Sequence, residues 1–213
     1  TAIQRNVDHF NPQAIANTLL AINQMGVEWH TLPTDRLRGD LFTAIQRNVD
    51  HFNPQAIANT LLAINQMGVE WHTLPTDRLR GDLFTAIQRN VDHFNPQAIA
   101  NTLLAINQMG VEWHTLPTDR LRGDLFTAIQ RNVDHFNPQA IANTLLAINQ
   151  MGVEWHTLPT DRLRGDLFTA IQRNVDHFNP QAIANTLLAI NQMGVEWHTL
   201  PTDRLRGDLF TAI

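Results

Sequence analysis

The feature that most constrains this chain is a repeat of 42 residues that recurs without a single substitution. The repeated unit reads TAIQRNVDHFNPQAIANTLLAINQMGVEWHTLPTDRLRGDLF. Its five copies occupy residues 1–42, 43–84, 85–126, 127–168 and 169–210, and residues 211–213 begin a sixth. A period of this length is typical of helical arrays, in which each unit buries its apolar surface against its neighbours. We therefore interpret residues 1–213 as a single repeat domain.

The identity of the copies bears on the origin of the sequence. Natural repeats drift, because each copy accumulates its own neutral changes while it keeps the packing pattern. Identity over five copies favours a designed or consensus sequence, and a very recent natural duplication is the alternative.

Because the copies are identical, a residue type missing from one unit is missing throughout. Cys is absent, which excludes disulfides and thiolate metal sites. No stretch approaches the roughly 20 apolar residues that span a bilayer, so we expect a soluble chain without a membrane partner. Each unit carries three Arg against three Asp and one Glu, and the chain has a net charge of −5. It therefore lacks the basic excess that proteins binding a phosphate backbone usually carry.

The second copy, residues 43–84, serves to describe one unit. Its first helix, helix A, is predicted over Pro54–Met67. Asn53 and Pro54 form a strong helix start, because Asn caps free amide groups and Pro suits the first helical position. Gly68 stands where a left-handed C-terminal cap belongs.

Apolar residues cover most of the surface of helix A, with Ile57, Leu61 and Ile64 at the centre of the apolar face. A helix with so little polar surface is covered from several directions, so we expect helix A to be the inner helix of the stack. Its polar residues form a narrow stripe of Gln55, Asn59 and Gln66, with Leu62 beside it.

The second helix, helix B, is predicted to start at Pro75-Thr76-Asp77, with Pro in its first turn. It should end near residues 91–94, because the following Asn95-Pro96 disfavours helix at the residue before proline. Trp71 and Phe94 lie at the two helix junctions, where we expect them to fill gaps between layers. The apolar face comprises Leu79, Leu83, Ala86, Ile87 and Val91, and the polar face Arg78, Asp82, Gln88, Arg89 and Asp92.

Two antiparallel helices per unit, joined by short connections, predict an all-α fold. The expected architecture is an α-solenoid, or superhelix, of antiparallel two-helix 42-residue repeats. Five copies of this pattern predict ten to eleven helices in alternating A and B order.

Residues 54–68, PQAIANTLLAINQMG, resemble the first-helix signature of octotricopeptide-type repeats, although Leu62 stands where that family usually has Trp. The 42-residue unit as a whole more closely resembles the tandem repeats of SKWP-type type III effectors of plant-pathogenic bacteria. This resemblance implies a HEAT- or armadillo-like helical fold and, for a natural protein, secretion by the bacterium and action in the host cell. Solenoid folds host many binding roles, so the resemblance implies no particular ligand.

The polar stripe of helix A is the first candidate ligand surface. Its members in the second and third copies are Gln55, Asn59, Gln66, Gln97, Asn101 and Gln108. These amides repeat along one surface and could read bases, as in helical-repeat RNA binders. The alternative, which we favour, is that Asn59 hydrogen-bonds the backbone of the adjacent layer while Gln55 and Gln66 face solvent.

Arg80 and its copy Arg122 are the second candidate, because they fall on the apolar side of helix B while Arg78 and Arg89 face water. They could line a groove for an acidic or phosphate ligand. The alternative, which we favour, is a partly buried ion pair between repeats, with Glu70 or an Asp as the partner and the Arg stem packed against apolar neighbours.

We predict no catalytic, metal or cofactor site. His72 and His93 have no second His or Cys at ligand spacing, and stacked copies should lie about 8–10 Å apart, too far to share a metal. Asp92-His93 resembles part of a catalytic dyad, but the unit has no Ser or Cys to serve as a nucleophile. An active site needs different chemical groups that converge on one pocket, whereas this chain presents the same set of side chains five times. We therefore expect that it is not an enzyme.

The predicted function is that of a designed or consensus scaffold based on a protein-binding solenoid. The alternative is sequence-tolerant binding of single-stranded RNA or DNA, for which five identical units would favour a homopolymer. A protein partner is the preferred expectation, because the net charge is negative.

The two outer layers predict a second partner, another copy of the chain. By register, Thr1 falls in the middle of helix B, and Ile213 follows its first half. Without polar capping units, apolar side chains in these layers lack a neighbour, and each is worth about 1.5–3 kcal/mol when buried. We therefore expect head-to-tail stacking of copies into an open, fibre-like array.

Overall fold

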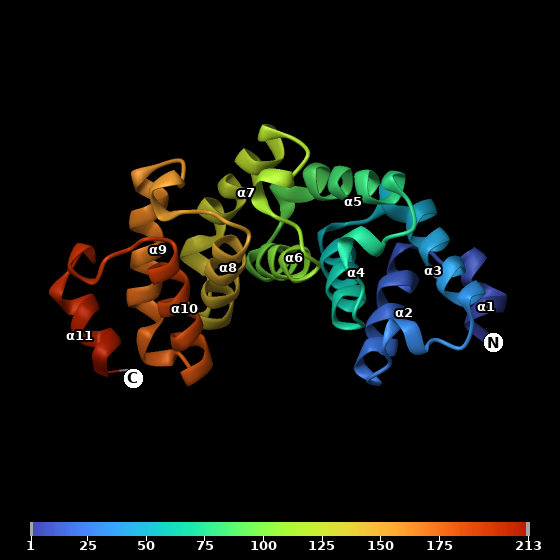
Figure 1. The fold of residues 1–213 in the computed structure, drawn as a ribbon, viewed down its shortest axis with the longest axis horizontal. Coiled ribbons are helices and arrows are strands. Elements are labelled where there is room, and N and C mark those ends of the chain that lie inside the picture. Colours follow the sequence, from blue (N-terminus) through green and yellow to red (C-terminus); the bar gives the residue numbers. More distant parts are fainter. Residues whose placement is uncertain (1, 212–213) are drawn as a thin grey trace.

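The computed structural model describes residues 2–211, and this part of the chain forms an arch of stacked helices without a β-strand (Figure 1). Eleven α-helices alternate between the two types within that range, which confirms the predicted all-α solenoid. The A helices are α2 (Pro12–Gln24), α4 (Pro54–Gln66), α6 (Pro96–Gln108), α8 (Pro138–Gln150) and α10 (Pro180–Gln192). The B helices are α1 (Ala2–Asn6), α3 (Asp35–Asn48), α5 (Asp77–Asn90), α7 (Asp119–Asn132), α9 (Asp161–Asn174) and α11 (Asp203–Thr211).

Short 3-10 helices form part of the connections between these helices. Those that follow B helices are η1 (Val7–His9), η3 (Val49–His51), η5 (Val91–His93), η7 (Val133–His135) and η9 (Val175–His177). Those that follow A helices are η2 (Trp29–Thr31), η4 (Trp71–Thr73), η6 (Trp113–Thr115), η8 (Trp155–Thr157) and η10 (Trp197–Thr199). The predicted end of helix B therefore tightens into a 3-10 turn before the next proline.

Helix A begins and ends where the sequence predicts. Asn95 Oδ1 accepts a hydrogen bond from the backbone N–H of Ala98 at 2.8 Å, and Pro96 occupies the first turn of α6. Gly110 follows the helix with φ +91°, the left-handed conformation that glycine adopts at little cost.

The start of helix B differs from the prediction in one detail. Thr118 is the N-cap of α7, and its Oγ1 accepts from the backbone N–H of Leu121 at 3.0 Å. Pro117 therefore precedes the cap and does not occupy the first turn. Asp119 lies in that first turn, where the positive end of the helix favours a carboxylate.

The A helices line the inside of the arch and the B helices form its outside (Figure 1). Each A helix packs directly against the A helix of the next unit, and these are the most extensive helix–helix interfaces in the described part of the chain. The packing of helix A on neighbours on both sides, expected from its apolar circumference, is thus confirmed, and the structure adds that the A helices line the concave side of the arch. α6 has a neighbour on both sides and buries seven of its residues, whereas α2 at the edge of the stack buries four.

The apolar core is continuous along the stack. Phe94 is 3% exposed and belongs to this core. Trp71 is only half-buried and packs against Phe84, with 4.5 Å between ring centroids. The backbone N–H of Trp71 also donates to the carbonyl of Met109 in the next unit at 2.8 Å, so the loop ties two layers together.

Within residues 2–211, none of the helices has the combination of length and apolar content needed to cross a membrane.

Candidate functional site

The polar stripe of the A helices faces the concave side of the arch. On α6, Gln97 is exposed and Asn101 is half-buried, while Ala100 and Leu103 on the same helix are buried. Because the B helices cover the other side of the A helices (Figure 1), the surface of helix A that stays open to solvent lies on the inside of the arch.

Three consecutive hollows lie between the N-terminal halves of the central A helices. Their volumes are about 170 Å³ between α4 and α6, about 350 Å³ between α6 and α8, and about 350 Å³ between α8 and α10. Gln97 and Asn101 border the first two hollows, and Gln139 and Asn143 border the last two, so the hollows form one groove. We call it the amide groove; its amide side chains are Gln55, Asn59, Asn95, Gln97, Asn101, Asn137, Gln139, Asn143, Asn179, Gln181 and Asn185.

Small side chains form the floor of the amide groove. Ala98, Ala100 and Ala140 border the hollows and are 5%, 2% and 6% exposed. Asn95 also borders the groove, although the sequence indicated only its capping role. Among the described residues that line the three hollows there is no Asp, Glu, Lys or Arg, and His177 beside the third hollow is the one titratable group. The groove is therefore polar and uncharged.

The amides in the middle of the groove have no partner in the protein. Within residues 2–211, the side chains of Asn59, Asn101 and Asn143 make no hydrogen bond, and neither do the glutamines four residues before them. On α10, in contrast, Asn185 accepts from Gln181 at 2.8 Å. Asn59 thus does not bond the adjacent layer, which differs from the interpretation that the sequence favoured. Each free amide offers two donors and an acceptor to a ligand.

The C-terminal halves of the A helices also carry amide side chains, but these are hydrogen-bonded to amides of the neighbouring A helix. Asn65 Nδ2 donates to Gln108 Oε1 at 2.7 Å, and Asn107 Nδ2 donates to Gln150 Oε1 at 2.6 Å. We call these contacts the amide bridges. Gln66 accepts in the same way from the preceding layer. Gln66 and Gln108, predicted as part of the ligand surface, are therefore held in bridges outside the amide groove.

Five segments of the sequence match one protein family, DUF1601, which is described as a protein of unknown function. The chain belongs to the DUF1601 family. The matched segments are residues 1–19, 25–61, 67–103, 109–145 and 151–187. No protein with a curated description matches this chain.

The DUF1601 matches divide the A helices into the same two halves as the amides do. The segment 67–103 runs from the end of α4 through α5 into the first half of α6, so it contains Gln97 and Asn101. The bridging residues Asn107 and Gln108 fall between this segment and the next. Each internal DUF1601 segment therefore carries one set of groove amides.

The arginines of this DUF1601 chain lie on the outer layer. Arg80 Nη1 donates to the carbonyl of Leu74 at 2.7 Å, and its Nη2 pairs with Asp77 in the same helix. Arg80 is thus partly buried and ion-paired as the favoured interpretation held, but the pair forms within one repeat and not between repeats. Arg80 and its copy Arg122 lie outside the amide groove.

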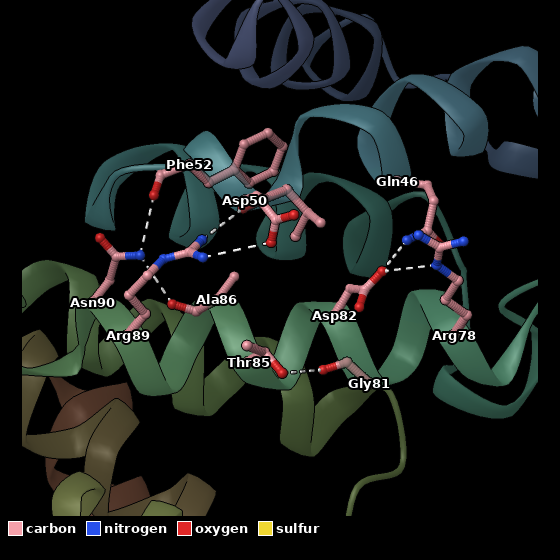
Figure 2. Close-up of polar contacts among 11 residues, drawn as sticks. Gln46, Asp50, Phe52, Arg78, Gly81, Asp82, Thr85, Ala86, Arg89 and Asn90 are labelled. Carbon is pink, nitrogen blue, oxygen red and sulfur yellow. Dashed lines mark hydrogen bonds and ion pairs between the residues drawn. The ribbon is translucent and has the colours of Figure 1, made fainter.

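Polar contacts also join successive B helices (Figure 2). Arg89 Nη1 lies 3.5 Å from Asp50 Oδ1 of the preceding unit. Asp82 on α5 accepts from Gln46 on α3, and its carboxylate lies 3.6 Å from Arg78 Nε on its own helix. In these contacts the charged side chains of the outer layer pair with polar or charged groups of the protein itself.

The amide that bridges backbone layers is Asn90, which sequence reasoning missed. Its Nδ2 donates to the carbonyl of Phe52 in the preceding unit at 3.1 Å and to that of Ala86 at 2.9 Å (Figure 2). Its copy Asn132 makes the same pair of bonds and is 6% exposed. A signal was present, because Asn90 follows Ala86 by four residues and Ile87 by three. It therefore lies on the apolar face of helix B, where an amide must be bonded.

The histidines of the DUF1601 repeats are on exposed connections. His72 Nδ1 lies 3.2 Å from Glu70 Oε2, and both side chains are more than half exposed. Asp92, which precedes His93 in the sequence, lies 3.5 Å from Arg131 of the next unit. Residues 2–211 contain no group of three His, Cys, Asp or Glu side chains that could hold a metal ion.

Proposed function

We propose that this chain is a non-catalytic scaffold that binds a polypeptide along the amide groove. The observation that carries the proposal is the combination, in one groove, of unpaired amides, an alanine floor and no formal charge. A polypeptide main chain presents N–H donors and C=O acceptors, which the side chains of Asn and Gln can bond in either direction. The small floor residues let a backbone approach closely.

Charge favours a polypeptide over a nucleic acid. Binding a phosphate backbone depends on cations that neutralise the phosphates. The amide groove offers none, since every arginine in the described chain lies on a B helix. The net charge of −5 would also oppose the approach of a polyanion.

Repetition favours binding over catalysis. Catalysis requires different groups that converge on one reacting atom. The amide groove instead presents the same Gln and Asn in successive layers, at Gln97 and Asn101 and again at Gln139 and Asn143. A ligand that spans several layers gains a similar contact from each, because later contacts form within an existing complex.

Selection of peptides from a displayed random library tests the proposal. Enriched peptides are synthesised and titrated against the Asn101→Ala/Asn143→Ala variant, in which two groove amides are removed. The matched control is Asn107→Ala/Asn149→Ala, in which two amide bridges are removed. We expect the groove variant to lose at least tenfold in affinity, about 1.4 kcal/mol, and the bridge variant to stay within about threefold. Equal losses, or no enriched peptide, would contradict the proposal.

Binding to heparin and to the four RNA homopolymers distinguishes polypeptide binding from the alternative, binding of single-stranded RNA or DNA. We expect no retention on either matrix at moderate salt. Tight retention that fades steeply as salt rises would show phosphate binding through arginines and would overturn the polypeptide proposal.

We propose in addition that the sequence is a designed consensus of a repeat family. The support is the identity of the five copies. The codons of the gene test it, because a recent natural duplication leaves identical codons in every copy. Identical codons in a bacterial genome would overturn this proposal, and copies encoded by different codons would support it.

We also propose that the outermost layer can stack on a second copy of the chain. Trp197 and Phe210 are 40% and 67% exposed, whereas their copies Trp155 and Phe168 are half-buried under the next layer. Light scattering of the 213-residue chain over a range of concentrations should show growing, open-ended species. A strict monomer at high concentration would rule out this association.

A further inference from the structure

Resting on the proposed function, we propose that the amide groove selects one backbone conformation, a polyproline II helix that advances three residues per layer. The ligand is then an uncharged, proline-tolerant segment that lies across α4, α6, α8 and α10. Its main chain bonds the free amides, and every third side chain enters a hollow.

The spacing of the layers is the first argument. Neighbouring helices pack about 8–10 Å apart, so the groove repeats its amides at that interval. A polyproline II helix has three residues per turn and rises about 3.1 Å per residue, so one turn advances about 9.3 Å. One turn of the ligand therefore matches one repeat of the groove.

The symmetry of the ligand is the second argument. Identical layers require a ligand that presents the same face at each of them. Successive turns of a polyproline II helix do so, because residues three apart point the same way. A β-strand rises about 3.3 Å per residue and alternates its faces, so three residues would span the layer but present the opposite side.

Hydrogen bonding is the third argument. A polyproline II segment makes no internal hydrogen bonds, so its N–H and C=O groups remain available to partners. The groove supplies free partners at three successive layers, because Asn59 on α4, Asn101 on α6 and Asn143 on α8 are unbonded. An α-helix bonds its own backbone and would leave these amides without a partner.

Charge then determines which side chains can enter the hollows. The two larger hollows, of about 350 Å³, have room for a side chain. Their walls carry amides such as Gln97 and Gln139, and no Asp, Glu, Lys or Arg lines either hollow to compensate an ion placed there. Burying an unpaired charge is costly, so the side chain at every third position should be uncharged.

Two fluorescein-labelled peptides of equal length and without charged side chains test this inference by fluorescence anisotropy. The first consists of four Pro-Gln-Thr triplets, and the second of six Thr-Gln pairs, which favour an extended strand. We expect the triplet peptide to bind at least tenfold more tightly. Replacing every Gln of the triplet peptide with Glu should weaken it at least tenfold.

Protein variants locate the binding. Asn101→Ala/Asn143→Ala should weaken the triplet peptide about tenfold, while the bridge variant Asn107→Ala/Asn149→Ala should leave it within about threefold. Affinity should also rise with each added triplet until the three hollows are filled.

The outcomes separate this inference from the proposed function. If the Thr-Gln peptide binds as tightly, or if only library-selected peptides bind, the three-residue register is wrong and the polypeptide scaffold stands. If neither these peptides nor any library peptide binds, both proposals fail. Equal affinity of the Glu-containing peptide would also overturn the inference, because the groove would then tolerate charge.

Discussion

The inner and outer helices of this solenoid come from the same 42-residue unit but treat their polar groups in opposite ways. The outer B helices carry every arginine of the described chain and engage their charges with Asp, Gln and backbone carbonyls. The inner A helices contain no charged residue, and their central amides are left free. Asn132 on a B helix is buried with two bonds, whereas Asn101 on an A helix is half-buried with none. Residue type therefore does not decide which amide is available to a ligand; the layer does and, within an A helix, the half of the helix, because the amides of the C-terminal halves are held in the amide bridges.

The largest contrast between the layers should appear when these two asparagines are replaced. Asn132→Ala removes the donor to the carbonyls of Phe94 and Ala128, and we expect a loss of about 1–3 kcal/mol in the free energy of unfolding. Asn101→Ala breaks no hydrogen bond in the protein and should change the free energy of unfolding by less than about 0.5 kcal/mol. Urea denaturation at constant m-value measures both. Equal losses would show that the groove amide is structural after all.

Glycine substitutions give a contrast of opposite sign. Gly110, after α6, has φ +91°, so Gly110→Ala should lose about 1 kcal/mol or more. Gly123 lies inside α7, and a Cβ added there would meet no atom within 4 Å. Gly123→Ala should therefore gain about 0.5–1 kcal/mol from helix propensity. Thermal melting of the two variants should move in opposite directions; a loss in both would mean that Gly123 has a role in packing.

The same change from Thr to Val should also act differently in the two layers. Thr102 on α6 is 0% exposed, and its Oγ1 has no partner, so Thr102→Val should gain about 1 kcal/mol. Thr118 caps α7, so Thr118→Val should lose about 1 kcal/mol. The urea concentrations at the unfolding midpoints of the two variants can be compared with that of the parent chain. A loss at Thr102 would indicate a bound water or another partner for its hydroxyl.

The smallest effect is expected on the outer surface. Arg120 Nε lies 3.5 Å from Asp124 Oδ2, and the arginine side chain is 83% exposed. Exposed ion pairs contribute little, so Arg120→Gln should change stability by less than about 0.5 kcal/mol. Peptide affinity should be unchanged as well. A clear loss of peptide binding would move the ligand from the inner to the outer layer.

The sequence predicted the helices well and the contacts between layers poorly. Asn95-Pro96 and Gly110 mark the ends of α6, and the apolar circumference of helix A placed it inside the stack. Those features depend only on the sequence of one helix and on how its residues are distributed around the helix axis. The pairing of Asn65 with Gln108 depends on how far each layer is shifted against the next, which a helical wheel does not contain. For the same reason the inter-layer role was assigned to Asn59 and belongs to Asn90.

The partner of Arg80 illustrates a different limit. The sequence placed its stem correctly on the apolar side of helix B, because that follows from periodicity. Its carboxylate partner could have come from several acidic residues, and the choice of Asp77 depends on the rotamer of a long, flexible side chain. Periodicity predicts a direction for such a residue but not the atom that it meets.

The hydrogen bond from Trp71 to Met109 recurs between later layers, from Trp113 to Met151 and from Trp155 to Met193, each at 2.8 Å. In mechanical terms the junctions are equal links in series. A force applied along the arch acts equally on each of these junctions, so no junction inside the stack is expected to break before the others. Within residues 2–211, α2 and α10 each pack against one A helix only, so in a molecule of these residues we expect the layers that contain them to detach before the others. Stretching a single molecule should therefore release layers one at a time from the outside inward, in steps of uniform length.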